Sequence, residues 1–209
     1  RLAFIRDQIA ALFERDPQTP KPLGGLSVLD IGCGGGLLSE PLARMGADVL
    51  GIDAAAKSVD VASLHARESG LSCRYRCATA EELLAEARRF DVVLAMEVVE
   101  HVPEPSAFIT TTAKLVRPGG ALVLSTINRT IKAFALAVIG AEYVLRWLPR
   151  GTHDWRRFVR PSEMASALRA AGLDLRTLTG VVYNPITDRW GLGRDLGTNY
   201  MAFAARPNE

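Results

Sequence analysis

Residues 27–38 read Ser-Val-Leu-Asp-Ile-Gly-Cys-Gly-Gly-Gly-Leu-Leu, a short apolar run that leads directly into a glycine-rich turn. Glycines at such a turn let the backbone bend tightly and let a ligand approach without a Cβ in the way. In a dinucleotide-binding fingerprint the third glycine would stand at position 37, which is Leu37 in this chain. The stretch predicts a strand, a ligand-binding turn and a helix that begins near Leu37.

Short apolar runs alternate with longer amphipathic stretches along the chain. Such alternation is typical of βαβ units around a parallel sheet. The predicted strands lie at residues 28–31, 49–52, 91–95 and 121–125. Residues 117–120, Arg-Pro-Gly-Gly, are turn formers placed immediately before the last of these runs, as a tight connection from a helix to a strand requires.

The two ends of the chain complete the predicted architecture. Residues 1–24 predict a helix with apolar residues at helical spacing, followed by a proline-containing loop. Residues 177–183 and 199–205 predict two more strands, which can pair as a terminal antiparallel hairpin. We therefore predict one α/β domain over residues 1–209, Rossmann-like, with a mostly parallel seven-stranded sheet, a C-terminal antiparallel hairpin and a helical insertion at residues 128–160 after the fifth strand.

Composition narrows the class of partner. The chain carries 25 Lys and Arg against 23 Asp and Glu, so it lacks the large basic field with which a nucleic-acid binder neutralises phosphates. We expect no nucleic acid, and a small or lipid-like substrate instead. Cys33, Cys73 and Cys77 are an odd set without paired zinc spacing, which favours reduced thiols in a reducing compartment over a disulfide framework.

A carboxylate, Asp53, closes the second apolar run about twenty residues after the glycines, where an acid can accept hydrogen bonds from both ribose hydroxyls of a bound nucleoside. The glycines and the acid together indicate such a site more strongly than either does alone. The alternative is that the glycines form a structural turn and that Asp53 caps the next helix.

The Gly-x-Gly-x-Gly pattern of Gly32, Gly34 and Gly36 resembles the first motif of class I methyltransferases, which use S-adenosylmethionine as the methyl donor. The resemblance implies that these glycines and Asp53 contact this cofactor. Residues 78–81, Ala-Thr-Ala-Glu, depart from the superfamily, in which an adenine-contacting acid often follows the third strand.

Several longer stretches go beyond the superfamily. They are Glu-Val-Val-Glu-His-Val at 97–102, Ser-Thr-Ile-Asn-Arg-Thr at 125–130, Gly-Ala-Glu-Tyr-Val-Leu-Arg at 140–146, Pro-Arg-Gly-Thr-His-Asp-Trp at 149–155, Tyr-Asn-Pro at 183–185 and Asn-Tyr-Met at 199–201. Over its whole length the chain resembles the ubiquinone-biosynthesis O-methyltransferases, which methylate polyprenyl-catechol and demethylubiquinol intermediates. Residues 125–130 and 149–155 are the most specific part of this resemblance.

The family resemblance implies further cofactor contacts. Gly32, Asp53 and Met96 match its cofactor-contacting positions, and Arg1 matches an arginine at the start of the first helix that reaches the cofactor. The guanidinium of Arg1 can fork onto the carboxylate of the methionine part, or lie exposed at a helix end. The thioether of Met96 can pack against the adenosine or methionine part, or fill the core.

Glu97, Glu100 and His101 follow the fourth predicted strand. If a helix begins there, spacings of three and four place them on one face, where two carboxylates and an imidazole can hold a hard divalent ion that favours a phenolate. The resemblance implies magnesium as a metal cofactor at these positions. The alternative is that no metal binds, because Glu-His-Val also follows the fourth strand in many methyltransferases that need none.

Without a metal, His101 is the first candidate for the general base, since imidazole titrates close to neutral pH. His153 with Asp154 is the second candidate pair, in which the acid orients the ring; a structural loop contact is the alternative. The chemical step is an in-line displacement, so most of the catalysis is expected to come from positioning the oxygen and excluding water.

Residues 130–148 combine apolar bulk with basic ends and are interrupted by Glu142. The segment is too short to span a bilayer, yet this composition suits an interfacial helix near anionic lipid. The resemblance implies peripheral membrane contact through this region, where a polyprenyl substrate would be collected. The alternative is a lid helix buried over the active site.

Together these observations predict an O-methyltransferase that transfers a methyl group from S-adenosylmethionine to a phenolic hydroxyl of polyprenyl-catechol and demethylubiquinol intermediates. Two alternatives stay open: a methyltransferase of another small phenol or carboxylate, and a low-activity subunit that binds the cofactor and lipid within a quinone-biosynthesis protein complex. The expected location is the bacterial cytoplasm, peripheral to the inner membrane, or the matrix face of the mitochondrial inner membrane.

Overall fold

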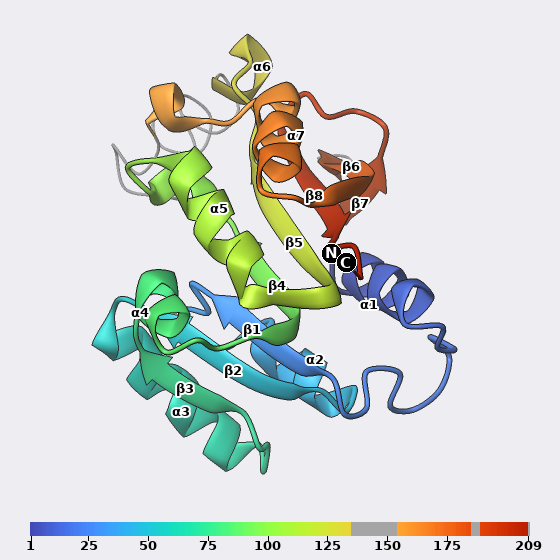
Figure 1. The fold of residues 1–209 in the computed structure, drawn as a ribbon, viewed down its shortest axis with the longest axis vertical. Helices are drawn as coiled ribbons and strands as arrows, with labels where there is room; N and C mark the ends of the chain where they lie inside the picture. The colour runs from blue at the N-terminus through green and yellow to red at the C-terminus, as the bar shows by residue number, and fades with distance from the viewer. Residues whose placement is uncertain (135–153, 185–188, 209) are drawn as a thin grey trace.

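The computed structural model describes residues 1–134, 154–184 and 189–208, which are built around one β-sheet (Figure 1). Within these residues the sheet has eight strands in the order β3-β2-β1-β4-β5-β8-β6-β7. The strands are β1 Ser27–Ile31, β2 Asp48–Asp53, β3 Arg74–Cys77, β4 Phe90–Met96, β5 Val116–Ile127, β6 Asp174–Asn184, β7 Arg189–Gly193 and β8 Asn199–Ala205. Strands β1 to β5 pair in parallel, whereas β8 runs antiparallel to both β5 and β6. The predicted Rossmann-like, mostly parallel sheet is confirmed.

The predicted number of seven strands is wrong, because the described C-terminal part contains one strand more. β7 lies in the stretch that the sequence favours as a loop, where Gly191 and Gly193 weaken strand propensity. It pairs antiparallel with β6, and the rings of Tyr183 and Trp190 face each other across the two strands with centroids 5.1 Å apart. The predicted antiparallel pairing of β6 with β8 is confirmed, but the two are not a simple hairpin, since β7 comes between them in the chain.

Helices cover both faces of the sheet (Figure 1). They are α1 Leu2–Leu12, α2 Ser39–Arg44, α3 Ala56–Glu68, α4 Ala80–Ala85, α5 Pro105–Leu115, α6 Ile131–Ala133 and α7 Pro161–Ala170, with short 3₁₀ helices η1 Val99–His101 and η3 Trp155–Arg157. Side chains along a strand point to alternate faces, so Leu29 enters the core shared with α4, α5 and α7, while Val28 enters the core shared with α1 and α2. Strand β4 is therefore buried on both sides, as its continuous apolar run predicts.

The turn formers at residues 117–120 lie inside β5 rather than before it. Phe90 of β4 pairs with Val116, and the next pair joins Val92 to Ala121, so the pairing is irregular across the turn. Gly119 there has φ +74°, a backbone conformation that favours glycine. Regular pairing begins at Ala121, where the sequence predicts the start of the strand.

The predicted insertion is described only at its two ends, and residues 135–153 lie outside the described residues. The indole N–H of Trp155 donates to the carbonyl oxygen of Thr130 at 3.4 Å, and the rings of Phe134 and Trp155 meet edge to face with centroids 6.3 Å apart. The two ends therefore lie side by side. No helix in the described ranges has both the length and the apolar character needed to cross a membrane.

Candidate active site

The glycine-rich turn between β1 and α2 has three glycines in the left-handed region. Gly32, Gly34 and Gly36 have φ of +70°, +52° and +82°. A Cβ on Gly32 would lie 2.5 Å from Cγ2 of Val98, whereas a Cβ on Gly34 would meet nothing within 4 Å. Gly32 is therefore required by packing as well as by backbone conformation, and Gly34 by backbone conformation alone. The following helix begins at Ser39, two residues beyond the predicted Leu37.

Asp53 ends β2 directly beside this turn. Its Oδ2 accepts a hydrogen bond from the backbone N–H of Gly34 at 3.0 Å, and its Oδ1 accepts one from Ala55 at 2.8 Å. The backbone N–H groups of Gly32 and Cys33 donate to the carbonyl oxygen of Ile52, at 2.8 and 3.0 Å. These bonds join the glycine turn to the end of β2, so the structure brings together the predicted glycines and the predicted acid.

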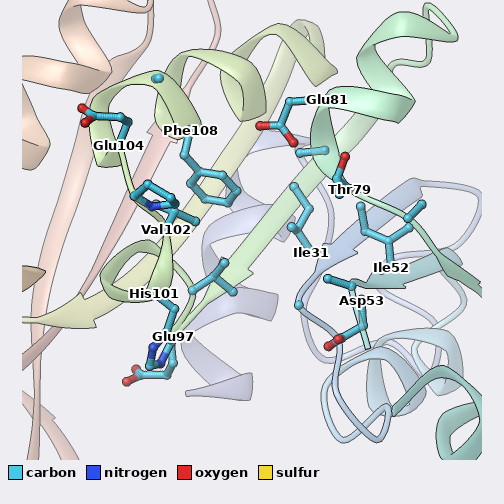
Figure 2. A pocket seen from close by; sticks show the side chains of 17 residues that line it. Ile31, Ile52, Asp53, Thr79, Glu81, Glu97, His101, Val102, Glu104 and Phe108 are labelled. Carbon is cyan, nitrogen blue, oxygen red and sulfur yellow. The ribbon is translucent and has the colours of Figure 1, made fainter. Parts of the chain in front are cut away.

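A cavity of about 710 Å³ opens at the carboxyl ends of β1, β2 and β4 (Figure 2). Figure 2 shows Asp53 at one end of the cavity and Glu97 with His101 at the other, with Ile31 and Phe108 between them. The described lining residues are Ile31, Gly32, Ile52, Asp53, Ala54, Ala78, Thr79, Ala80, Glu81, Glu97, Val98, His101, Val102, Pro103, Glu104, Ala107 and Phe108. Ligands of open parallel sheets bind in this position, beyond the carboxyl ends of the strands.

The lining fits a nucleoside. Apolar side chains such as Ile52 and Phe108 provide walls for a flat base, Gly32 presents bare backbone, and the carboxylate of Asp53 can accept bonds from a ribose. Of the residues predicted for the cofactor, Gly32 and Asp53 line the cavity. Residues 78–81 also line it, although the sequence offers no aspartate at that turn.

The other predicted cofactor residues lie around the cavity rather than on its described lining. Gly34 and Gly36 shape the turn, and Met96 packs against the core shared with α1 and α2. Arg1 lies at the far end, where its Nη1 is 3.2 Å from Oε1 of Glu97. The first helix therefore does carry its arginine to the active-site region, where it meets an acid.

A buried acid, Asp30, lies next to the glycine turn and bonds to the first residue of α2. Asp30 is 2% exposed, and its Oδ2 accepts a hydrogen bond from the hydroxyl of Ser39 at 2.6 Å. Burial, opposed by this bond and reinforced by the charge of Asp53, raises the pKa of Asp30 from 3.8 to about 6. The folded chain therefore holds this proton more tightly than the unfolded chain does.

The raised pKa of Asp30 predicts a pH-dependent stability. As pH rises from about 4 to about 6 the unfolded chain releases this proton first, so the wild-type protein loses stability across that window and does not regain it above. Asp30→Asn stays neutral, and its free energy of unfolding is expected to exceed that of the wild type by up to about 3 kcal/mol at pH 8 and by less at pH 5. Urea denaturation at both pH values measures the difference; the same difference at both would contradict the assignment. Asp60→Asn, on α3, is the control.

Glu97 is the best-connected acid at the opposite end of the cavity. Its Oε1 accepts hydrogen bonds from the hydroxyl of Ser125 at 2.7 Å and from Nδ2 of Asn199 at 3.0 Å, and Nδ2 is also 3.0 Å from Oε2. The backbone N–H of Glu97 donates to both the hydroxyl and the carbonyl oxygen of Ser125, each at 3.0 Å. Ser125 of β5 and Asn199 of β8 thus fix this side chain.

Glu100 and His101 have different surroundings. Glu100 is 4% exposed, and its Oε2 accepts a hydrogen bond from Thr126 at 2.7 Å. Burial, followed by the charge of Glu97, raises the pKa of Glu100. His101 is exposed and lines the cavity.

The helix assumed for Glu97, Glu100 and His101 is absent from the described structure. Glu97 precedes η1 with φ +59°, and η1 is one 3₁₀ turn, so the α-helical spacing argument for one shared face is wrong. Among the described residues, no group of three or more His, Cys, Asp or Glu side chains could hold a metal ion. The present arrangement of these three side chains does not fit a three-ligand magnesium site, and magnesium stays a prediction.

The second candidate pair is described only in part. His153 lies outside the described residues. Asp154 accepts a hydrogen bond from the backbone N–H of Arg156 at 3.0 Å, which caps η3.

Sequence reasoning missed the partners of the two acids. Ser125, Thr126 and Asn199 lie within the stretches 125–130 and 199–201 that distinguish the chain from other methyltransferases, but their residue types alone suggest no role. Their contacts with Glu97 and Glu100 depend on β5 lying between β4 and β8.

Comparison with known proteins agrees with the geometry. The family model described as "Methyltransferase domain" matches residues 1–178. The chain is 58% identical over 207 residues to a ubiquinone biosynthesis O-methyltransferase of Chelativorans sp. (strain BNC1), covering 99% of this chain and 82% of that protein. A protein of the same name from Brucella anthropi is 55% identical, with 99% and 84% covered. The crystal structure of magnesium protoporphyrin IX methyltransferase (ChlM) from Synechocystis PCC 6803 with bound SAH has a TM-score of 0.70 at 25% identity, covering 98% of this chain and 83% of that one.

The sheet order, the glycine turn and the cavity beside Asp53 define a class I methyltransferase that uses S-adenosylmethionine as its methyl donor. The extent of identity then fixes the group within that class. The chain belongs to the family of ubiquinone biosynthesis O-methyltransferases.

Proposed function

We propose that the protein transfers a methyl group from S-adenosylmethionine to a phenolic hydroxyl of polyprenyl-catechol and demethylubiquinol intermediates in ubiquinone biosynthesis. The observation that carries the proposal is the identity of 55 to 58% with relatives of that name, over 99% of this chain. Bound S-adenosylmethionine supplies a sulfonium methyl group, which is open to attack by an oxygen nucleophile.

The described residues divide between two tasks. Gly32 and Asp53 hold the nucleoside end of the donor, and the other end of the cavity, lined by Glu97 and His101, receives the acceptor. The phenolic oxygen forms its bond to the methyl carbon as the carbon–sulfur bond breaks, and the phenolic proton must leave. We assign His101 as its acceptor, because imidazole titrates close to neutral pH and this side chain lines the cavity.

Methyl transfer to a short-tailed demethylubiquinol analogue tests the function. The wild type is expected to turn over, and His101→Ala is expected to lower kcat about 100-fold with a nearly unchanged Kd for S-adenosylmethionine. The assay is run with magnesium and with a chelator, so that loss of turnover on chelation would restore magnesium to the mechanism. Cofactor binding without turnover would favour another small phenol or carboxylate as substrate, or a low-activity subunit of a quinone-biosynthesis protein complex.

We also propose peripheral membrane contact through residues 130–148, at the cytoplasmic face of a bacterial inner membrane or the matrix face of a mitochondrial one. Most of this segment lies outside the described residues. Its described start supports the proposal, because Ile131 is 83% exposed beside the basic Lys132.

Flotation with anionic liposomes tests this contact. Ile131→Asp is expected to lower the bound fraction severalfold, since it replaces exposed apolar surface with a charge that anionic lipid repels. Leu64→Asp is the matched control, because Leu64 is also an exposed aliphatic side chain, 48% exposed on α3. If the bound fraction fell equally in both variants, or fell in neither, contact through residues 130–148 would be contradicted.

A further inference from the structure

The starting observation is an unusual backbone conformation at Glu97. Three described residues other than glycine have positive φ: Glu14, Ala87 and Glu97. Glu14 and Ala87 each follow the C-cap of a helix, where the left-handed conformation is common. Glu97 instead directly follows the last residue of β4, at the wall of the cavity. Strained residues of this kind persist where the surrounding structure holds them, often at functional sites.

The residues that hold Glu97 are buried and come from two other strands. Ser125 of β5 is fully buried, and it engages both the backbone and the carboxylate of Glu97. Asn199 of β8 is 8% exposed, and its Nδ2 lies 3.0 Å from each carboxylate oxygen. Arg1 adds a positive charge on the Oε1 side. Glu97 is therefore fixed in direction while its side chain remains 32% exposed on the cavity.

The amide of Asn199 has one oriented half and one unsatisfied half. Because Nδ2 faces the carboxylate, Oδ1 faces the other way, and it is buried without a hydrogen-bond partner. Such a group costs stability, and it sits in a strand, where asparagine is disfavoured. Turning the amide over would satisfy nothing, since it would set Oδ1 against the carboxylate. Asn199 therefore lowers the stability of the fold, and its bond to Glu97 is the feature that explains its presence here.

We propose that Asn199, assisted by Ser125, is a positioning residue that aims the Glu97 carboxylate at the acceptor hydroxyl. Glu97 accepts the hydrogen bond of that hydroxyl and so turns an oxygen lone pair toward the methyl group. As the oxygen bonds to the methyl carbon, the proton passes to Glu97 and on to His101 beside it (Figure 2). Asn199 acts only through Glu97 and has no part in holding the methyl donor. This inference rests on the proposed function, because it requires a hydroxyl-bearing acceptor.

A double-mutant cycle in the full chain tests the proposal. At saturating S-adenosylmethionine, Asn199→Ala is expected to lower kcat about tenfold and Glu97→Gln about 100-fold, the range expected when hydrogen bonds to a charged group are lost. The double variant is expected to match Glu97→Gln within about threefold, since residues that act through one another are not additive. The Kd for S-adenosylmethionine, measured by calorimetry, should stay within about twofold throughout.

Asn128→Ala is the matched control. Asn128 is also 8% exposed, but its Nδ2 donates to the carbonyl oxygen of Leu196 at 2.8 Å rather than to Glu97. Its effect, of whatever size, should multiply with that of Glu97→Gln, as independent effects do. Thermal unfolding checks that the fold is intact: Asn199→Ala removes an unsatisfied group and should leave the Tm within a few degrees of the wild type.

A second readout depends on the acceptor rather than on the fold. Asn199→Ala should lose less activity on a more acidic phenol, whose oxygen needs less help to react, and a purely structural defect would not depend on phenol acidity. Multiplicative losses of Asn199→Ala and Glu97→Gln, with a loss that is the same for all phenols, would overturn the proposal. Should Asn199→Ala fail to fold, Ser125→Ala carries the same cycle. Absence of wild-type turnover would instead overturn the proposed function.

Discussion

Alanine in place of Asp53 is expected to raise the Kd of S-adenosylmethionine about 100-fold or more, because two hydrogen bonds from ribose hydroxyls to a charged group are lost. The same change removes the bonds that Asp53 accepts from the backbone of Gly34 and Ala55, so the turn itself is less well ordered for binding. Isothermal calorimetry with S-adenosylmethionine measures the change.

The control for this experiment lies at the other end of the same strand. Asp48 begins β2 and pairs with Arg74, and both side chains are more than half exposed. Asp48→Ala is expected to leave the Kd within about twofold, since an exposed ion pair contributes little. An unchanged Kd in Asp53→Ala would show that Asp53 organises the turn without binding the nucleoside.

The second large effect concerns Gly32. Gly32→Ala is expected to lower the free energy of unfolding by about 2 to 5 kcal/mol, from left-handed strain together with the clash against Val98. Gly34→Ala suffers the strain without a clash, so its loss should be about 1 to 2 kcal/mol. Urea denaturation compares the two variants.

A compensating change separates strain from clash. Val98→Ala in the Gly32→Ala background removes the methyl group, Cγ2, that the new Cβ would meet at 2.5 Å, and is expected to recover part of the lost stability. Equal losses in Gly32→Ala and Gly34→Ala, with no recovery on adding Val98→Ala, would contradict this account of the turn.

The parts of the fold that sequence predicts well are those set by local pattern. The glycine turn, the strand before it and Asp53 are close in sequence or linked by a fixed spacing, and the structure places them together. Continuous apolar runs in the sequence predict the buried strands β4 and β5. β7 escaped prediction because its glycines resemble a loop, and its stability depends on its pairing with β6, including the contact of Trp190 with Tyr183.

In the candidate site, too, the sequence predicts which residues are present but not how they are arranged. The sequence identifies Glu97, Glu100 and His101 as a group, but their local geometry depends on how the chain leaves β4. The positive φ of Glu97 reflects bonds to Ser125 and Asn199, which are distant in sequence. No helical or strand periodicity records such bonds, so the sequence could not show that these residues leave β4 through a 3₁₀ turn.

The place of β8 between β5 and β6 shapes how the protein reaches this fold. Ala205 lies opposite both Ala121 and Asp174, so the pairings of β8 close loops over long stretches of chain, a slow kind of contact to form. Until β8 docks, β5 has an unpaired edge of the kind that promotes aggregation. The strand that seals this edge also carries Asn199. A folding molecule therefore fixes Glu97 in the same step that covers the open edge of β5.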